Sequence, residues 1–417
     1  MVDEDNSSLM MNIRQSVLQY CTSSTSNRVS KWTMTYILEY ICTEIWIFLF
    51  MGFALTGWFV WFALFCWLLV QAKLLYSTND ESIDFDNPTL AWMKTRFIIV
   101  LSAFTLYTWF WRQDRGTEEC GSHPRKFMRK LRLWKLLRDY FPVHLILCDD
   151  IVARQNPTRT DKSTIQGTQK ITCNPSLFPA SKNYLVGYHP HGIFGVGAFV
   201  NFATESNGFS EKFPGLTPWL TTLEVNFKAP FQRDFLMSFT VFSIVSDVVA
   251  ATLKGITYLL DPQRCGKRGN FVIVVLGGAP EALDSRPGKY IFHTNRRYGF
   301  FKLALTTGST LVPCISFGET NMYQQIKNPP GGRLRKFQDR FTEIATFSPP
   351  IFYARAWMPY RTPVNTVVGT PIPVPKVEQP SREQVAELKD LYLDKLNQLF
   401  QRYKPIYDPQ ACDLEFF

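Results

Sequence analysis

The chain has 417 residues, a formal net charge of +10 and nine cysteines. The cysteine number is odd and no CxxC pair occurs, which argues against a disulfide framework and a zinc ribbon and indicates free thiols in a reducing compartment. The positive charge favours an anionic membrane surface or an anionic substrate as partner. Nucleic acid is disfavoured, because the charge is densest just after apolar segments rather than in a recognisable nucleic-acid-binding fold.

The N-terminal third contains two apolar runs. Residues 1–44 are mostly polar and Ser/Thr-rich, which predicts a cytosolic, largely disordered tail. Ile45–Val70 has 26 residues without a charged side chain, and about 20 apolar residues suffice to span a bilayer. Phe97–Trp111 has 15 residues, so it predicts either the return arm of a hairpin or a segment lying in the interface. We therefore expect a transmembrane hairpin within residues 45–111.

Basic residues predict the orientation of this hairpin. Gln71–Arg96, between the apolar runs, contains three basic and four acidic side chains, whereas Arg112–Arg138 contains nine basic and three acidic ones. The positive-inside rule places the second segment in the cytosol. Residues 112–417 are thus predicted to form one cytosol-facing, membrane-associated domain, and the N-terminus is cytosolic if both runs span.

Pro124–Phe141 has the pattern of an amphipathic helix. Phe127, Leu131, Trp134 and Phe141 recur near helical spacing, and basic residues lie mostly elsewhere. Aromatic and basic residues together favour a helix in the headgroup plane, directly after a membrane segment. An ordinary surface helix over the core is the alternative. Residues 154–182 show little periodicity and predict a loop.

From Tyr184 onward, apolar strand-like runs alternate with helical patterns. This alternation predicts an α/β fold with a mostly parallel sheet and flanking helices. The last helix is expected to begin at Ser381, with Gln384 completing a capping box. Its apolar face carries Val385, Leu388, Tyr392, Leu396 and Leu399, and the expected strands are Tyr184–Tyr188, Phe271–Leu276, Thr310–Phe317 and Thr366–Val368.

Three of these strands end in turn-and-charge clusters. They are His189-Pro190-His191-Gly192, Gly277-Gly278-Ala279-Pro280-Glu281 and Gly318-Glu319. Ligands bind at the carboxyl ends of strands in open α/β sheets, so these clusters predict one shared site.

The His-Pro-His-Gly turn favours a general base near neutral pH, with the Glu281 carboxylate orienting an imidazole. A metal-binding His pair is disfavoured, because only His293 follows as a further histidine ligand. Two surface histidines in a turn remain a second alternative.

The ordered motifs resemble the diacylglycerol O-acyltransferase type 2 family, which includes monoacylglycerol and wax-alcohol acyltransferases. The similarity runs from about Trp134 to about Tyr403. It is carried by these segments: Arg138-Asp139-Tyr140-Phe141-Pro142, Tyr188-His189-Pro190-His191-Gly192-Ile193, Lys212-Phe213-Pro214-Gly215, Asn226-Phe227, Gly277-Gly278-Ala279-Pro280-Glu281-Ala282-Leu283, Pro287-Gly288, Gly299-Phe300, Lys302-Leu303-Ala304, Leu311-Val312-Pro313 and Ser316-Phe317-Gly318-Glu319.

The resemblance implies acyl-CoA as co-substrate, no further cofactor or metal, and an acylglycerol or alcohol acceptor. It also implies a multi-pass protein of the endoplasmic reticulum membrane that associates with lipid droplets; a homo-oligomer is left open. The essential histidines of the family fall on His189 and His191. Its Tyr-Phe-Pro motif falls on Tyr140, Phe141 and Pro142, and its Gly-Gly-x-x-Glu motif on Gly277, Gly278 and Glu281.

Chemistry then suggests roles for these residues. We expect His191 to be the base, with His189 packing beside it or sharing the proton. Direct transfer is favoured because no G-x-S-x-G elbow or activated cysteine is evident. Backbone N–H groups of the glycine-rich turns are candidate oxyanion donors. The residues expected to bind substrate at these turns and at the Tyr-Phe-Pro motif are Pro190, Gly192, Gly277, Gly278, Tyr140, Phe141 and Pro142. The basic cluster Arg296, Arg297 and Lys302 is expected to bind the CoA phosphates; a solvated helix end is the alternative.

Two segments depart from the family pattern, and the first of them bears on the shape of the acceptor pocket and hence on acceptor choice. Phe239-Thr240-Val241-Phe242-Ser243 stands where the family shows Gly-Gly and a Pro, and Phe48-Leu49-Phe50-Met51 stands in place of a Phe-Leu-x-Leu motif. The favoured function is esterification of diacylglycerol to triacylglycerol. The alternatives are a monoacylglycerol or wax-alcohol acyltransferase, and a catalytically inactive lipid-binding protein of lipid droplets.

Overall fold

The computed structural model describes residues 32–49, 53–80, 88–115, 117, 126–148, 177–223, 227–237, 248–250, 253–295, 297–345, 348–355 and 358–417. Several expectations fall outside these ranges: the tail before residue 32, most of the loop 154–182, the segment Phe239–Ser243, and Arg296.

A seven-stranded sheet organises the domain, in the order β1-β10-β7-β2-β5-β3-β4. Only the β10–β7 pairing among the described strands of this sheet is antiparallel, which confirms the mostly parallel α/β prediction. The four expected strands are present, and three further ones were not predicted. The strands are β1 (Val143–Leu147), β2 (Tyr184–His189), β3 (Thr217–Thr222), β4 (Val248–Ala250), β5 (Asn270–Val275), β7 (Thr310–Phe317) and β10 (Val364–Val368).

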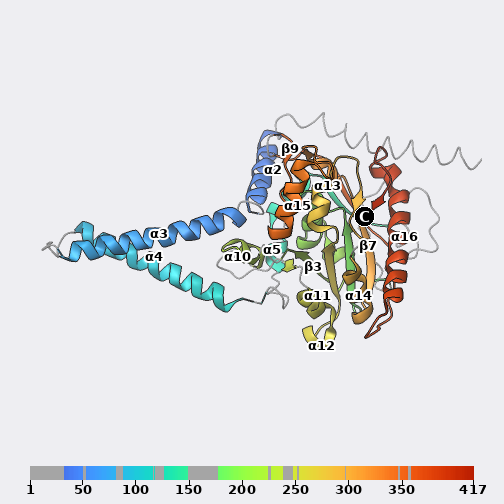
Figure 1. The fold of residues 1–417 in the computed structure, drawn as a ribbon, viewed down its shortest axis with the longest axis horizontal. Helices are drawn as coiled ribbons and strands as arrows, with labels where there is room; N and C mark the ends of the chain where they lie inside the picture. The colour runs from blue at the N-terminus through green and yellow to red at the C-terminus, as the bar shows by residue number, and fades with distance from the viewer. Residues whose placement is uncertain are drawn as a thin grey trace, which may run out of the picture.

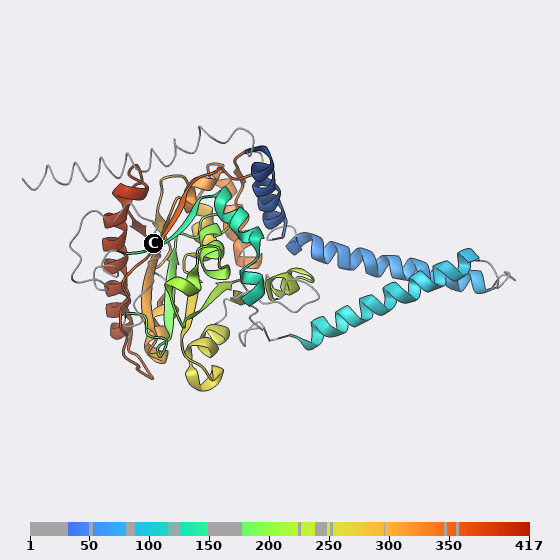
Figure 2. The same ribbon diagram turned by 180° about the vertical axis from the view of Figure 1, so that it is seen from behind.

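Helices cover both faces of this sheet. Successive residues of a strand point to opposite faces. Tyr188 of β2 packs on Phe202 of the π-helix η4 (Phe199–Ala203), whereas His189 packs on Tyr392 of α16 (Arg382–Tyr407). This two-sided burial explains why all eight residues of β7 are buried, and why they form a nearly continuous apolar run. Figures 1 and 2 show α16 along one side of the sheet.

Shorter elements complete the domain. The helices are α8 (Val196–Ala198), α9 (Phe209–Lys212), α10 (Gln232–Met237), α11 (Leu253–Leu260), α12 (Pro262–Cys265), α13 (Gly278–Asp284), α14 (Tyr298–Thr307), η6 (Glu319–Met322) and α15 (Arg333–Ala345). Two small sheets pair β6 (Ile291–Phe292) with β11 (Glu415–Phe416), and β8 (Gln324–Gln325) with β9 (Phe352–Tyr353).

The capping box of α16 is confirmed. The Ser381 hydroxyl accepts from the Gln384 amide, and the Gln384 side chain accepts from the Ser381 amide. All five residues of the predicted apolar face are buried. Capping and one-sided burial together fix where the helix begins and how it is rotated.

A helical hairpin projects from the domain (Figures 1 and 2). It consists of α3 (Phe53–Asp80) and α4 (Pro88–Gln113). Thr56–Ser77 and Pro88–Gln113 are each long and apolar enough to cross a membrane, by length and composition. Helix α4 is longer than the apolar run Phe97–Trp111, because it begins at Pro88. Proline is favoured in the first turn of a helix.

Helix α2 (Trp32–Ile47) crosses the domain boundary expected at residue 44. It packs against the domain with Glu39, Cys42, Thr43 and Trp46 buried. Arg361 fastens it, because its Nη2 lies 2.6 Å from Glu39 Oε2. The apolar stretch that begins at Ile45 therefore belongs to two helices, one on the domain and one in the hairpin.

The predicted helix over Pro124–Phe141 is broken into α5 (Lys126–Arg129) and α6 (Arg132–Tyr140). Its apolar residues Trp134, Leu137 and Tyr140 are buried in the protein. Trp134 packs edge-on against Phe199 of η4. Protein thus covers Trp134 and Phe141 of the predicted lipid-facing set, whereas Phe127 is exposed. Periodicity identifies an apolar face, but not whether lipid or protein covers it.

Candidate active site

The three clusters at the strand ends lie at one edge of the sheet, as predicted. β2 pairs in parallel with β7 on one side and β5 on the other. Its terminal residue, His189, is opposite Ile315, two residues before β7 ends. The His-Pro-His-Gly turn is thus placed between the Gly-Gly-x-x-Glu turn and Glu319, as the carboxyl-end rule requires.

Two buried carboxylates hold the loop that follows β2. Glu281 Oε2 accepts from the backbone amide of His191 at 2.7 Å. Glu319 Oε2 accepts from the amide of Gly197 at 2.9 Å and from the Tyr188 hydroxyl at 3.1 Å. The expectation that Glu281 orients an imidazole is not met, because its bond is to the main chain.

Glycine is required at two positions beside these carboxylates. A Cβ at Gly277 would overlap the Glu281 carboxylate, which folds back over the turn. Gly192 has φ +63°, and a Cβ there would lie 2.7 Å from Glu319 Cγ. Both glycines therefore let a carboxylate approach the main chain closely.

His191 is half-buried, and one contact fixes its tautomer. Its Nδ1 lies 3.1 Å from the carbonyl oxygen of Gly192. A carbonyl only accepts, so Nδ1 carries the proton and Nε2 keeps the lone pair. Burial lowers the pKa of His191 below its ordinary value, which keeps the ring neutral near pH 7. His191 is therefore ready to accept a proton at Nε2.

His189 is fully buried, in a different environment. Its ring stacks on Phe292, and its Nε2 lies 3.2 Å from the Tyr392 hydroxyl. Because that hydroxyl donates to the Gly187 carbonyl, Nε2 is the donor to Tyr392. Burial lowers the pKa of His189 to about 3. Its packing is that of a neutral core histidine, two residues before the half-buried His191.

Both carboxyls of the site bind protons more tightly than usual. Burial raises the pKa of Glu281 to about 8, and the His191 amide offsets part of this shift. Burial likewise raises the pKa of Glu319 to about 7. Desolvation disfavours the charged form when no cation is close enough to compensate. Glu281 is thus mostly protonated at neutral pH.

The Tyr-Phe-Pro motif also comes to this edge. β1 is parallel to β10, which runs against β7, so β1 starts where β7 ends. The Val364 amide donates to the Pro142 carbonyl at 3.2 Å. Tyr140 and Phe141 are buried, and the Tyr140 hydroxyl donates to the Pro359 carbonyl at 2.9 Å. This packing anchors β1 at the site, and contact of the motif with substrate stays a prediction.

Two residues of the predicted phosphate cluster, Arg297 and Lys302, lie within the described part of the chain. Arg297 Nη2 donates to the Gly277 carbonyl at 2.9 Å, at the glycine-rich turn. Lys302 is exposed on α14, and Arg296 is outside the described residues. The structure thus brings Arg297 to the site, and phosphate binding by the three cations stays a prediction.

An aromatic wall adjoins the turn. Phe194 packs against Trp46 of α2, with ring centroids 6.2 Å apart, and against Tyr323 and Phe352 at 5.3 and 5.4 Å. Sequence reasoning missed this wall because its rings come from distant segments. The same holds for Tyr392, whose apolar periodicity indicated burial but not a bond to His189.

Comparisons with known proteins place the chain in a family. Residues 171–417 match the family model "Diacylglycerol acyltransferase". The chain belongs to the diacylglycerol acyltransferase family. It is therefore an acyltransferase, and the strand-end turn with its two histidines lies within the matched region.

Individual relatives agree with this assignment. The chain is 36% identical to 2-acylglycerol O-acyltransferase 1 of Bos taurus, covering 75% of this chain and 85% of the relative. It is also 36% identical to diacylglycerol O-acyltransferase 2 of Homo sapiens, covering 73% and 71%. A crystal structure of a 1-acyl-sn-glycerophosphate acyltransferase from Thermotoga maritima matches 71% of this chain and 95% of that one, at 12% identity and a TM-score of 0.32.

Proposed function

We propose that this acyltransferase uses acyl-CoA to convert diacylglycerol to triacylglycerol, with His191 as general base and no further cofactor. The observation that carries the proposal is the fixed tautomer of His191. Its Nδ1 proton is held by the Gly192 carbonyl, so the half-buried ring presents a basic Nε2. The core position of His189 supports this choice between the two imidazoles.

The proposed reaction is a direct transfer. Nε2 of His191 takes the proton of the acceptor hydroxyl while its oxygen attacks the thioester carbonyl. The tetrahedral intermediate collapses, the carbon–sulfur bond breaks, and the imidazolium returns the proton to the CoA thiolate. Glu281 positions the base through the backbone amide of His191. The balance of atoms is an ester and free CoA from an alcohol and a thioester.

A monoacylglycerol is the second candidate acceptor. The relative named 2-acylglycerol O-acyltransferase 1 is as similar to this chain, at 36% identity, as the one named diacylglycerol O-acyltransferase 2. An acceptor panel decides between them: membranes containing the full chain receive labelled acyl-CoA with diacylglycerol, 2-monoacylglycerol or a long-chain alcohol. Labelled triacylglycerol is the expected main product. Absence of any ester product would overturn the acyl-CoA proposal.

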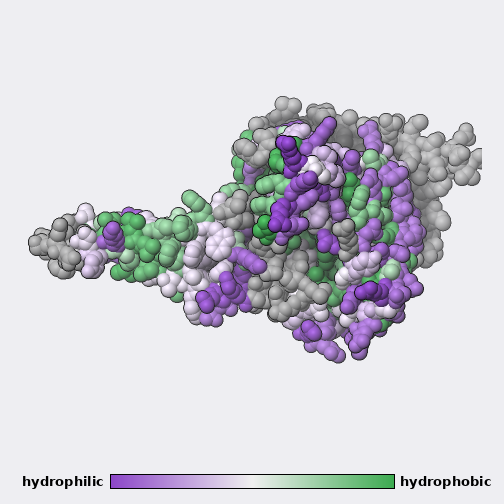
Figure 3. Space-filling model, viewed as in Figure 1, coloured by the Kyte–Doolittle hydropathy of each residue, from purple (hydrophilic) through white to green (hydrophobic). Residues whose placement is uncertain are grey.

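We also propose that the α3–α4 hairpin spans a membrane, at the endoplasmic reticulum with association to lipid droplets. Figure 3 shows apolar side chains over much of the visible face of the hairpin. Helix α2 adds a second surface with several exposed apolar side chains. This surface carries Met34, Ile37, Leu38, Ile41 and Ile45. If a lipid surface lies beside α2, the aromatic wall, which includes Trp46 of α2, lies next to an apolar acceptor in that surface.

The orientation is testable by cysteine labelling in sealed microsomes. A cysteine replacing Ser82, between the two spans, should react with a membrane-impermeant maleimide only after permeabilisation. Exposed Cys412 on the domain is the internal control and should react without it. Labelling of position 82 in sealed vesicles would contradict the proposed topology.

A further inference from the structure

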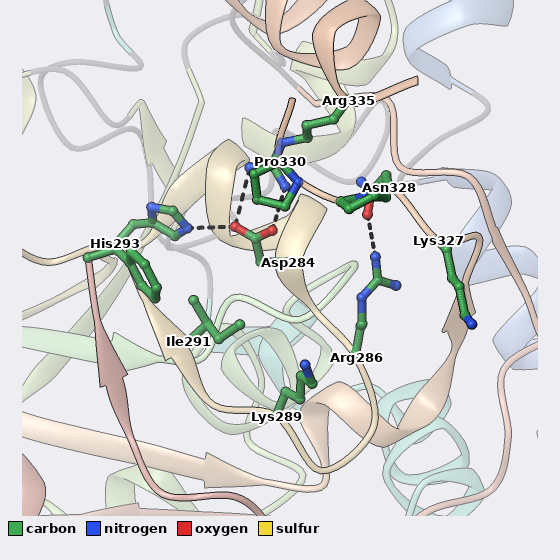
Figure 4. A pocket seen from close by; sticks show the side chains of 11 residues that line it. Asp284, Arg286, Lys289, Ile291, His293, Lys327, Asn328, Pro330 and Arg335 are labelled. Atoms are coloured by element: carbon green, nitrogen blue, oxygen red, sulfur yellow. Dashed lines mark hydrogen bonds and ion pairs between the residues drawn. The ribbon is translucent and has the colours of Figure 1, made fainter. Parts of the chain in front are cut away.

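A pocket of about 460 Å³ lies outside the histidine turn. Its walls come from the end of α13 and the chain after it, from the segment before α15 with its first turn, and from the C-terminal Phe417 (Figure 4). The pocket is cationic: Arg286, Lys289, Lys327 and Arg335 line it together with His293, and Asp284 is the single acidic side chain among the lining residues.

Asp284 is already occupied by protein partners. His293 Nε2 lies 2.8 Å from Asp284 Oδ2, and Arg335 also bonds this carboxylate. Burial acts to raise the pKa of Asp284, but these hydrogen bonds outweigh it and hold the pKa below its ordinary value. Lys289 and Lys327 are exposed, and no carboxylate in the described part of the chain pairs with either ammonium group. The pocket therefore keeps surplus positive charge.

The two arginines are held in place before any ligand binds. Arg286 donates to the side-chain oxygen of Asn328, and Arg335 Nε donates to Asp339 at 2.9 Å. Gln325 fastens this segment to α13, because its Nε2 donates to the carbonyls of Ala282 and Ser285, each at 2.7 Å. Fixed guanidinium groups with two free ammonium groups suit a ligand carrying several phosphate oxygens.

The pocket is close to the catalytic turn through one helix. Glu281, which holds His191, and Asp284 are three residues apart on α13, about one turn or ~5 Å along the axis. The C-terminal end of the chain lies on the side of the domain away from the hairpin (Figures 1 and 2). This placement favours a water-soluble anion over a lipid headgroup.

We propose that this pocket binds the phosphate groups at the nucleotide end of the acyl donor, while the thioester reaches His191. The inference rests on the proposed use of acyl-CoA, and it assigns the donor phosphates to Arg286, Lys289, Lys327 and Arg335. Arg297 then belongs to the glycine-rich turn, where it bonds the Gly277 carbonyl.

Lys289→Gln/Lys327→Gln in the full chain tests the assignment. Two donors with the same acyl chain are compared, acyl-CoA and acyl-pantetheine, which has no phosphate. KM for acyl-CoA should rise ~10-fold with kcat unchanged, because exposed charge–phosphate contacts contribute modestly each. KM for acyl-pantetheine should not change. Lys182→Gln/Lys395→Gln, which removes two exposed lysines elsewhere, should match the wild type with both donors.

Three results in the kinetic and vesicle-binding experiments would overturn the proposal. The first is an unchanged KM for acyl-CoA in an active variant, and the second is an equal loss with both donors. The third is loss of binding to vesicles containing phosphatidic acid with KM for acyl-CoA intact, which would make the pocket a headgroup site. If the wild type transfers no acyl group, calorimetric titration with free CoA separates the failure of the proposed acyl transfer from the failure of the proposed phosphate pocket. CoA binding that the double variant loses supports the pocket, and no CoA binding overturns it.

Discussion

Two histidines, separated by one proline, have opposite environments in this protein. His191 is half-buried with its Nδ1 proton on a carbonyl, and His189 is buried between Phe292 and Tyr392. His191→Ala should lower kcat by ~10²- to 10⁴-fold, the usual contribution of a general base, and leave the melting temperature nearly unchanged. Steady-state transfer to diacylglycerol is the measurement.

His144→Ala is the matched control, because that side chain is exposed on β1; it should keep wild-type kcat. His189→Ala should mainly lower the melting temperature, since it opens a space beside Tyr392. Full activity of the His191 variant would remove it as the base.

Substitutions of Glu281 show whether its negative charge or its hydrogen bond to the His191 amide matters for catalysis. Its pKa of about 8 makes it mostly neutral at pH 7, and Gln resembles the protonated form. Glu281→Gln should therefore stay within ~10-fold of wild-type kcat. Glu281→Ala should destabilise the protein by ~1–3 kcal/mol, because the His191 amide loses its partner. Activity and thermal melting are measured on both.

The pH profile separates these roles further. If Glu281 only positions His191, the fall of kcat/KM at low pH should be the same in Glu281→Gln as in the wild type. Protonation of His191 causes that fall. If Glu281→Gln were as inactive as His191→Ala, the negative charge of the carboxylate would be needed for catalysis.

At the scale of elements, α16 links stability to the site. The helix begins at a complete capping box and carries Tyr392 to His189. Ser381→Ala should cost ~1 kcal/mol of stability, since the Gln384 amide loses its acceptor. The readout is a lower melting temperature with unchanged kcat at low temperature. Ser381→Asp retains a capping oxygen and should have the melting temperature of the wild type. If Ser381→Ala also melted at the wild-type temperature, the cap would not contribute to stability.

Elements predicted from periodicity fared differently according to what covers them. β2, β5, β7 and α16 were predicted closely, because two-sided or one-sided burial leaves a regular pattern in the residues. β3 and β4 were missed. β3 (Thr217–Thr222) contains a proline and three threonines, and β4 is short. The strong amphipathic pattern around α6 was correct as a helix, but it did not show that the apolar side packs on the protein.

For the whole molecule, the buried groups predict how stability depends on pH. Glu281 and Glu319 have folded-state pKa values of about 8 and about 7, raised from 4.5, so the folded state binds more protons than the unfolded state between these limits. Their contribution is therefore lost as pH rises. This loss spans about pH 4.5 to 8, and it is unopposed above 6.5, the unfolded-state pKa of His189, so the melting temperature measured in detergent should fall between pH 6.5 and 8.

His189 acts in the opposite direction at lower pH. Its folded-state pKa of about 3 lies below its unfolded value of 6.5, so stability is lost as pH falls between these values. Because the glutamates and His189 act in opposite directions between about pH 4.5 and 6.5, Glu281→Gln/Glu319→Gln should flatten the fall above pH 6.5 and steepen the loss of stability below it. An unchanged alkaline slope in that variant would mean that other groups cause it.

The sequence by itself determined four of the seven strands of the main sheet, the last helix and the shared edge of the site. Burial patterns located the strands, and parallel strand order requires their carboxyl ends to meet, so His191, Glu281 and Glu319 were expected together. Only the tertiary structure decided what each group does there. The Glu281 bond to a backbone amide, the burial of His189 and the cationic pocket around Asp284 depend on contacts between distant segments. Local periodicity records whether a side chain is buried, but not which partner it meets.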